Sequence, residues 1–205
     1  MCNVKDHNKV STMSAIINRG TGAGGANTNL NGIAFEDKTD NSSYLLKNGF
    51  IQKPIPGSSG KYAYYLEKIV DGYRSIIFTK QNGLKNYMKY FHNKELFREP
   101  DEAYLFRNGT LYVLYVLEKK NQNGAGSVDV KLCAAQWFKD EYKECLGNNF
   151  TVEYGFCLSN FLKKEYGSDT LKWKTMRTLH NRASIRVLFG DDADYFTKLN
   201  EWLSL

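Results

Sequence analysis

Residues 99–122 read EPDEAYLFRNGTLYVLYVLEKKNQ, and this stretch decides the fold. Two β-prone runs, residues 102–107 and 110–117, flank the pair Asn108-Gly109. An Asn-Gly pair in this setting is the strongest short signal for a β-hairpin, because both turn residues need positive φ. The second run is apolar without alternation, which is typical of a central strand covered on both faces. The sequence therefore predicts a hairpin whose second strand lies inside a larger sheet.

The expected register of this hairpin gathers three polar side chains. With the Asn-Gly pair as the two loop residues, Asp101 faces Val116, and Glu118 and Lys120 follow at two-residue spacing. Because side chains alternate along a strand, Asp101, Glu118 and Lys120 then project from the same face. Asp101 and Glu118 become diagonal neighbours, with Cα atoms roughly 7–8 Å apart. Two carboxylates at that separation can share one hard cation such as Mg²⁺, which prefers oxygen ligands.

The remainder of the chain predicts strands interleaved with helices. Strands are expected at residues 50–55, 62–66, 74–78, 151–158 and 184–189. Helices are expected at residues 33–46, 82–91, 127–146, 160–166 and 192–203. This alternation indicates an α/β fold in which helices flank a mixed β-sheet. We expect a single domain over residues 1–205, with a flexible segment at residues 1–17 and a Gly/Asn/Thr-rich loop at residues 18–31.

Composition limits the class of protein. A chain of 205 residues, 42% of them hydrophobic, suits one globular domain, and it contains no apolar run long enough for a transmembrane helix. The N-terminus lacks the apolar core of a signal peptide, so we expect an intracellular, cytoplasmic protein without a membrane partner. The four cysteines lie far apart, so we expect reduced, mostly buried thiols rather than a zinc site. The net charge of +6 favours a polyanionic partner.

The polar residues of the hairpin resemble the signature of a nuclease superfamily. Pro100-Asp101, followed after sixteen residues by Glu118-Lys119-Lys120, is similar to the PD-(D/E)xK motif, which that superfamily carries on a β-hairpin leading into a helix. The following Gln122, residues 126–129 (GSVD) and Lys131 resemble type II restriction endonucleases more specifically. The resemblance covers residues 99–131. It implies a restriction-endonuclease-like fold and a homodimer that hydrolyses double-stranded DNA with Mg²⁺.

The resemblance also implies roles for the core residues. Asp101 and Glu118 are expected to ligate Mg²⁺, with the backbone carbonyl of Lys119 as a further ligand. Lys120 is expected to position the attacking water and to offset charge on the phosphate. Whether Lys120 also takes the proton stays open, because burial and the two adjacent carboxylates shift its pKa in opposite directions.

Three further candidates lie outside this core. Many members of the superfamily carry a helical glutamate that bonds a metal-bound water or binds a second metal, and Glu36 resembles it. An exposed helix glutamate explains Glu36 equally well. Gln122 is expected near the scissile phosphate, and Lys131 is expected to reach a backbone phosphate, although both residues also suit an ordinary polar surface.

A basic segment at residues 163–186 holds seven basic residues against Glu165 and Asp169. We expect part of the DNA-binding surface here, at Lys172, Lys174, Arg177, Arg182 and Arg186. Asn27 and Asn29 of the Gly/Asn-rich loop are expected to contact bases or phosphates. His92 and His180 are expected at the surface or against DNA. The alternative is a solvated basic face.

Three rival functions fit parts of the sequence. A structure-specific repair or junction-resolving nuclease needs the same catalytic residues. A DNA-binding module without catalysis does not need the complete Asp101, Glu118 and Lys120 set. A more remote alternative is a dinucleotide-binding oxidoreductase, because Gly20–Gly25 matches GxGxxG, although no convincing strand precedes the glycines.

Overall fold

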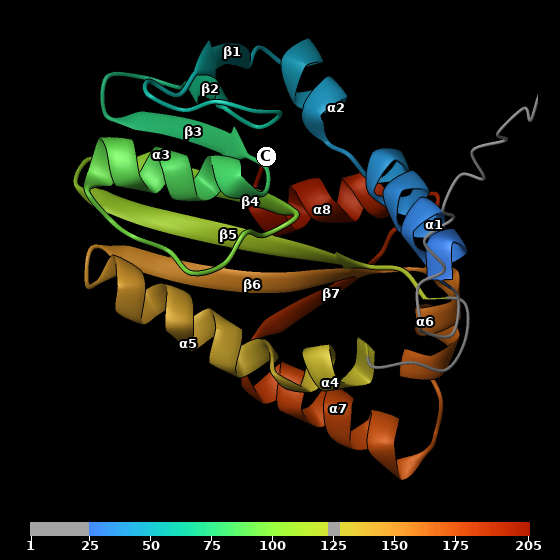
Figure 1. Cartoon of the computed structure of the whole chain (residues 1–205). Coiled ribbons are helices and arrows are strands. Elements are labelled where there is room, and N and C mark those ends of the chain that lie inside the picture. The colour runs from blue at the N-terminus through green and yellow to red at the C-terminus, as the bar shows by residue number, and fades with distance from the viewer. Residues whose placement is uncertain (1–24, 123–127) are drawn as a thin grey trace, which may run out of the picture.

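The computed structural model describes residues 25–122 and 128–205 (Figure 1). Its strands are β1 (Ile51–Pro54), β2 (Tyr64–Ile69), β3 (Arg74–Thr79), β4 (Glu102–Asn108), β5 (Leu111–Lys120), β6 (Phe150–Leu158) and β7 (Ile185–Phe189). Its helices are α1 (Gly25–Lys38), α2 (Ser42–Lys47), α3 (Asn82–His92), α4 (Val128–Cys133), α5 (Ala135–Leu146), α6 (Asn160–Tyr166), α7 (Leu171–Arg182) and α8 (Tyr195–Leu203).

The strands form one seven-stranded sheet in sequence order, from β1 to β7. Strands β1 to β5 pair antiparallel, whereas β5, β6 and β7 pair parallel. Short turns suffice between antiparallel strands, but each parallel pair needs a crossover. Helices α4 and α5 supply the first crossover, and α6 and α7 supply the second (Figure 1). The expectation of an α/β fold with a mixed sheet and flanking helices is confirmed.

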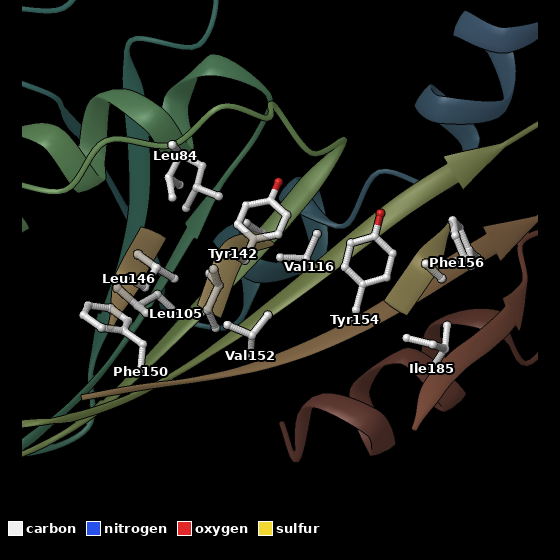
Figure 2. Close-up of a cluster of buried hydrophobic side chains, with 14 of the residues drawn as sticks. Leu84, Leu105, Val116, Tyr142, Leu146, Phe150, Val152, Tyr154, Phe156 and Ile185 are labelled. Atoms are coloured by element: carbon white, nitrogen blue, oxygen red, sulfur yellow. The ribbon is translucent and has the colours of Figure 1, made fainter. Parts of the chain in front are cut away.

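The central strand β5 is covered on both faces, as its unbroken apolar run predicts. Leu114 and Val116 belong to a buried cluster with residues of α3 to α7, part of which is drawn in Figure 2. Leu117 belongs to a second buried cluster with residues of α1, α2 and α8. Burial of both faces fixes the register of β5, because a slip of one residue would exchange the faces of every side chain.

The register of the β4–β5 hairpin differs from the prediction by two residues. Asn108 pairs with Leu111, so the loop residues are Gly109 and Thr110 rather than Asn108 and Gly109. Gly109 has φ of +63°, whereas Thr110 has no positive φ, which is the pattern of a type II′ turn with glycine first. Asn108 stays in the sheet because it also pairs with Arg74 of β3. A shift of two residues keeps every side chain on its predicted face.

Two expectations near the N-terminus are wrong. The predicted loop at residues 18–31 gives way to helix from Gly25 onward, and the predicted helix at residues 33–46 is divided into α1 and α2. Asparagine and glycine have low helix propensity, but packing of the later turns of α1, through Phe35, outweighs it. The division follows from Thr39 and Asp40. The Thr39 hydroxyl donates to the Phe35 carbonyl, and Asp40 accepts from the backbone N–H of Ser42.

Asn27 and Asn29 belong by their backbone to α1, and their side chains lie outside the described part of the chain. Of the GxGxxG match, only Gly25 is described, where it opens α1. The flexible segment expected at residues 1–17 also lies outside the described residues.

Helix α7 was not predicted, and it corrects the expected position of one histidine. His180 is 3% exposed, with Nε2 2.8 Å from the Leu132 carbonyl oxygen and Nδ1 3.1 Å from the Tyr166 hydroxyl. Trp173 on the same helix is also buried. The buried residues of α7 recur at helical spacing and fasten the helix to the sheet, so His180 is a core residue rather than a surface one.

The remaining helices differ from expectation in detail. The helix expected at residues 127–146 is interrupted at Ala134, and α8 begins at Tyr195 rather than at residue 192. The N-cap position of the helix after β3 is Gln81, one residue earlier than expected, and its side chain makes no capping hydrogen bond.

The thiols are free where described, but they are not mostly buried. Cys157 is buried, Cys145 is half-buried and Cys133 is exposed. Across residues 25–122 and 128–205, no helix combines the length and the apolar character needed to cross a membrane.

Burial of His180 predicts a pH dependence of stability. Burial lowers the pKa of His180 below its ordinary value of 6.5. Below that pH the unfolded chain therefore binds a proton that the native ring rejects, so stability present above about pH 6.5 is lost as the pH falls. We expect the free energy of unfolding, measured by urea titration, to fall between about pH 7 and 5, and to fall less in His180→Gln. Equal pH dependence in the two proteins would contradict this account.

Candidate active site

The open end of the β4–β5 hairpin holds two carboxylates. Continuing the observed ladder one residue beyond Glu102 and Leu117 places Asp101 across from Glu118, rather than across from Val116. The backbone N–H of Lys119 donates to Oδ2 of Asp101 at 2.5 Å. The Asp101 side chain is only 18% exposed. Asp101 is therefore fixed against β5 and is not a freely solvated turn residue.

Lys120 joins these two carboxylates. Its Nζ lies 2.6 Å from Oε2 of Glu118 and 3.6 Å from Oδ2 of Asp101. The side chains of Glu118 and Lys120 are each 16% exposed. The structure thus brings Asp101, Glu118 and Lys120 together in one cluster that is largely shielded from solvent.

The charges in this cluster are strongly coupled. Burial raises the pKa of Glu118, the Lys120 ammonium opposes that shift, and the Asp101 carboxylate adds to it. Burial alone would lower the pKa of Lys120, but Glu118 and Asp101 outweigh it and hold that pKa above its ordinary value. Lys120 is therefore a charged ammonium at neutral pH. In this state it can attract and orient an anion or a water.

Alternation turns the side chain of Lys119 to the opposite face, into a buried network. Its Nζ lies 2.7 Å from Oε1 of Glu102, and both side chains are at most 1% exposed. Oε1 of Glu102 also accepts from the backbone N–H of Asn41 at 3.2 Å, and Oε2 accepts from the Tyr104 hydroxyl at 2.7 Å. The Glu102 carboxylate is thus satisfied by three donors from separate parts of the fold.

Lys119 also reaches α1, which carries Glu36. Its Nζ lies 3.2 Å from the carbonyl oxygen of Glu36, in the last turn of that helix, where a cation is favoured. Burial raises the pKa of the half-buried Glu36, and the Asp101 carboxylate adds to the shift. The Glu36 carboxylate therefore lies within electrostatic reach of Asp101. The structure puts Glu36 beside the cluster rather than on a remote helix surface.

A glycine allows α1 to lie this close to the sheet. A Cβ atom at Gly190 would come within 2.6 Å of Cγ2 of Thr39 and 2.7 Å of Cζ of Phe35. Both contacts are shorter than real Cβ atoms tolerate, so a larger residue at position 190 would force the Thr39 and Phe35 side chains to move. The close approach of α1 follows from this residue and from the Lys119 contact.

A pocket of about 300 Å³ opens beside Glu118 and Lys120. Its other lining residues are Phe97, Arg98, Glu99, Lys131, Phe138, Tyr154 and Phe156. Lys131 is exposed on α4 and has no ion-pair or hydrogen-bond partner within residues 25–122 and 128–205. The structure therefore places Lys131 where an anion in the pocket would meet an unneutralised ammonium.

Gln122 is held at the end of β5 through its backbone. Its N–H donates to the Ser159 hydroxyl at 3.4 Å, and its carbonyl oxygen lies 3.4 Å from the same atom. Gln122 thus follows the cluster directly, between β5 and the start of α6.

The predicted DNA-contacting residues of α7 differ in their surroundings. Lys172 pairs with Asp129 of α4 at 2.6 Å, and Lys174 pairs with Asp169 at 3.5 Å. Arg177 donates from one terminal nitrogen to the carbonyl oxygens of Tyr166 and Ser168, so it supports the α6–α7 loop. Lys172 and Lys174 are more than half exposed and remain accessible to a polyanion.

The two remaining arginines do not lie together. Arg182 is exposed at the end of α7. Arg186 is exposed on β7, where its Cβ and the Trp202 ring of α8 both face Gly155. Its neighbour Ile185 packs with the α7 side of the core. Arg186 therefore points to the α8 side of the sheet and is separated from the α7 residues.

Sequence reasoning missed the Glu102–Lys119 pair and the pocket arginine Arg98. Glu102 and Lys119 each neighbour a predicted site residue, and strand alternation places them together on the other face. That signal was present in the sequence. Arg98 had no comparable signal, because its partner Glu141 lies 43 residues away.

The donor atoms of the cluster suit Mg²⁺. The carboxylates of Asp101 and Glu118 supply oxygen donors, and Mg²⁺ usually takes one or two protein carboxylates and keeps several waters. Burial raises the pKa of Glu118, and a divalent cation would favour its ionised form. Within the described residues, no group of three or more His, Cys, Asp or Glu side chains could hold a metal ion.

No protein-family model matches this chain, and the comparisons with curated proteins and with solved structures find no match either.

The buried ion pair predicts opposite outcomes for single and double variants. Glu102→Gln or Lys119→Met alone leaves a charge without its partner, which costs about 3–5 kcal/mol of unfolding free energy. The double variant Glu102→Gln/Lys119→Met removes both charges and keeps a similar volume, so it should recover most of that loss. Urea titration measures the free energy of unfolding of all three variants. A double variant no more stable than either single variant would show that the pair is not coupled.

Proposed function

We propose that this protein is a Mg²⁺-dependent endonuclease of the PD-(D/E)xK class that hydrolyses phosphodiester bonds of double-stranded DNA. The observation that carries the proposal is the cluster of Asp101, Glu118 and Lys120 at the open end of one hairpin. Two carboxylates and one ammonium, all partly shielded from water, suit the hydrolysis of an anionic ester better than they suit a structural ion pair at a surface.

The carboxylates would hold the cofactor. Asp101, Glu118 and the carbonyl of Lys119 would bind Mg²⁺, which supplies Lewis acidity and a bound water of lowered pKa. The N–H of Lys119 fixes the Asp101 carboxylate before any ligand arrives. This preorganisation favours catalysis, because the charged groups need not rearrange during the reaction.

Lys120 would act on the phosphate. The pKa of Lys120 lies above its ordinary value because Glu118 and Asp101 outweigh the effect of burial. A charged ammonium in this position offsets negative charge on the phosphate and orients the attacking water. Lys131 would bind an adjacent phosphate, because it lines the same pocket and has no partner among the described side chains.

Glu36 and Gln122 would complete the site. Glu36 is held near Asp101 through the contact between Lys119 and α1, which suits the retention of a metal-bound water or a second metal. Gln122 would contact DNA close to the cut, since it follows Lys120 by two residues.

Lys172, Lys174 and Arg182 on α7, with Asn27 and Asn29 on α1, would extend the DNA contact beyond the site. Arg177 and Arg186 remain in the proposed surface, although Arg177 also supports a loop and Arg186 requires DNA to pass the edge of β7.

The finer proposal is a sequence-specific type II restriction endonuclease acting as a homodimer in the cytoplasm. Residues 118–131 resemble such enzymes, and symmetric cutting of both strands requires two active sites. A second candidate is a structure-specific repair or junction-resolving nuclease. The exposed ring of Phe97 beside the pocket favours it, because unpaired bases stack on exposed rings.

Plasmid cleavage tests the proposal. With Mg²⁺ the wild-type protein should cut, and Asp101→Ala, Glu118→Ala and Lys120→Ala should each slow cutting by about two orders of magnitude or more. Ca²⁺ should support DNA binding without efficient cutting. Lys47→Ala, on the exposed surface of α2, is the matched control and should keep the wild-type rate. Melting temperatures show whether each variant is folded, and wild-type cleavage by folded Asp101→Ala would refute the assignment.

A further inference from the structure

The pocket beside the cluster is lined by both charged and aromatic side chains. The charged ones are Arg98, Glu99, Glu118, Lys120 and Lys131, and the rings are Phe97, Phe138, Tyr154 and Phe156. Tyr154 and Phe156 are almost fully buried, whereas Phe97 is 78% exposed. Phe156 lies beside Glu118 in the β5–β6 ladder. Catalysis needs only the charged side chains, so the aromatic lining calls for a separate explanation.

Arg98 forms a fixed planar wall of this pocket. Its guanidinium carbon lies 3.9 Å from the ring centroid of Phe138. Its Nε and one terminal nitrogen lie 3.1 and 2.9 Å from Oε2 of Glu141. One face of the guanidinium thus rests on Phe138 while Glu141 fixes its orientation. Nucleobases stack on planes of this kind, both aromatic rings and arginine guanidinium groups.

Phe97 gives the rim an unusually exposed aromatic ring. Of the large hydrophobic side chains in residues 32–122 and 128–205, only Leu171 is more exposed. An exposed aromatic ring next to a pocket offers a free face on which a base can stack. Phe97 directly precedes Arg98, so one short segment contributes both stacking surfaces.

Two tyrosines behind the pocket keep neutral hydroxyl groups close to Glu118. Burial raises the pKa of Tyr142 and of Tyr154, and the charge of Glu118 adds to both shifts. Figure 2 shows their hydroxyl groups pointing the same way within the core cluster. The Tyr142 hydroxyl is buried and has no hydrogen-bond partner among the residues that the structure describes. The neighbourhood of Glu118 therefore contains an unsatisfied neutral polar group as well as charges.

We propose that the aromatic lining of this pocket binds the base of one unstacked nucleotide next to the bond that is cut. Phe97 and the Arg98 guanidinium stack on the base, and Lys131 meets the phosphate of the same nucleotide. A pocket of about 300 Å³ suits a single ring system, since ligand pockets span roughly 300–1,000 Å³. This inference rests on the proposed function, because it takes Glu118 and Lys120 as catalytic residues.

The proposal names a preference among DNA substrates. A base must leave the helical stack to enter the pocket, and this step is easiest for a mismatched or unpaired base. DNA with unpaired nucleotides should therefore bind more tightly than the same sequence fully paired. The two DNAs carry the same number of phosphates, and the part of the affinity difference that depends on Phe97 reports the aromatic contact.

Fluorescence anisotropy with two labelled duplexes tests the preference. One 20-base-pair duplex is fully paired, and the other has the same sequence with three central mismatches. In Ca²⁺ and low salt, the wild-type protein should bind the mismatched duplex about tenfold more tightly. Phe97→Ala should bring the affinity ratio close to one, and Phe97→Trp should keep it.

Tyr73→Ala is the matched control. Tyr73 is 76% exposed, and its carbonyl oxygen accepts from Gly109 at the turn end of the hairpin, away from the pocket. This variant should keep the wild-type ratio. Equal binding of both duplexes by the wild-type protein, or an unchanged ratio in Phe97→Ala, would overturn the inference.

Failure of the proposed function would look different. One outcome is that the protein cuts neither duplex with Mg²⁺ or Mn²⁺, yet binds the mismatched one more tightly through Phe97. That result would support the base pocket and contradict the proposed nuclease activity. Cleavage of both duplexes, with no effect of Phe97→Ala on the affinity ratio, would support the nuclease activity and contradict the base pocket.

Discussion

Side-chain alternation over the last three residues of β5 is the constraint on which the site depends. Glu118 and Lys120 face the side of the sheet that carries α3 to α7, and Lys119 faces the side that carries α1 and α8. Lys119 forms an ion pair with Glu102, and both side chains are at most 1% exposed. Such a pair is a poor source of net stability, because desolvation offsets most of the attraction between the charges. Its geometric effect is clearer, since it links β4, β5 and α1 at one point.

This link explains how residues far apart in sequence reach one site. The Lys119 N–H holds Asp101, and its ammonium holds Glu102 and the carbonyl of Glu36. The same residue thus sets the position of one carboxylate directly and of the helix that carries another. Gly190 supplies the space in which α1 approaches the sheet. The backbone of Lys119 therefore positions Asp101, whereas its side chain positions α1.

Much of the fold could be predicted because its signals are local. The central strand, the hairpin and the shared face of Asp101 and Glu118 all follow from strand periodicity, which a two-residue error in register leaves unchanged. Helix α7 was missed because Lys172 to Arg182 are mostly polar, and its buried side chains stand out only after the helix is known. The pocket could not be predicted, because Arg98 meets Phe138 and Glu141 only through tertiary packing. The proposed catalytic roles come from the resemblance and from the chemistry of the residue types.

The central claim is that Asp101 and Glu118, at one face of β5, bind the metal. Lys119 and Glu102, at the other face, connect β4, β5 and α1. Binding of Mn²⁺, which accepts the same oxygen ligands as Mg²⁺, tests it directly by electron paramagnetic resonance of DNA-free protein. Adding wild-type protein to a Mn²⁺ solution should remove the signal of free Mn²⁺. Adding the Glu102→Gln/Lys119→Met double variant should remove it as well. Glu118→Gln and Asp101→Asn should leave that signal close to its value in buffer. Wild-type binding by folded Glu118→Gln, or loss of binding only in the double variant, would contradict the account.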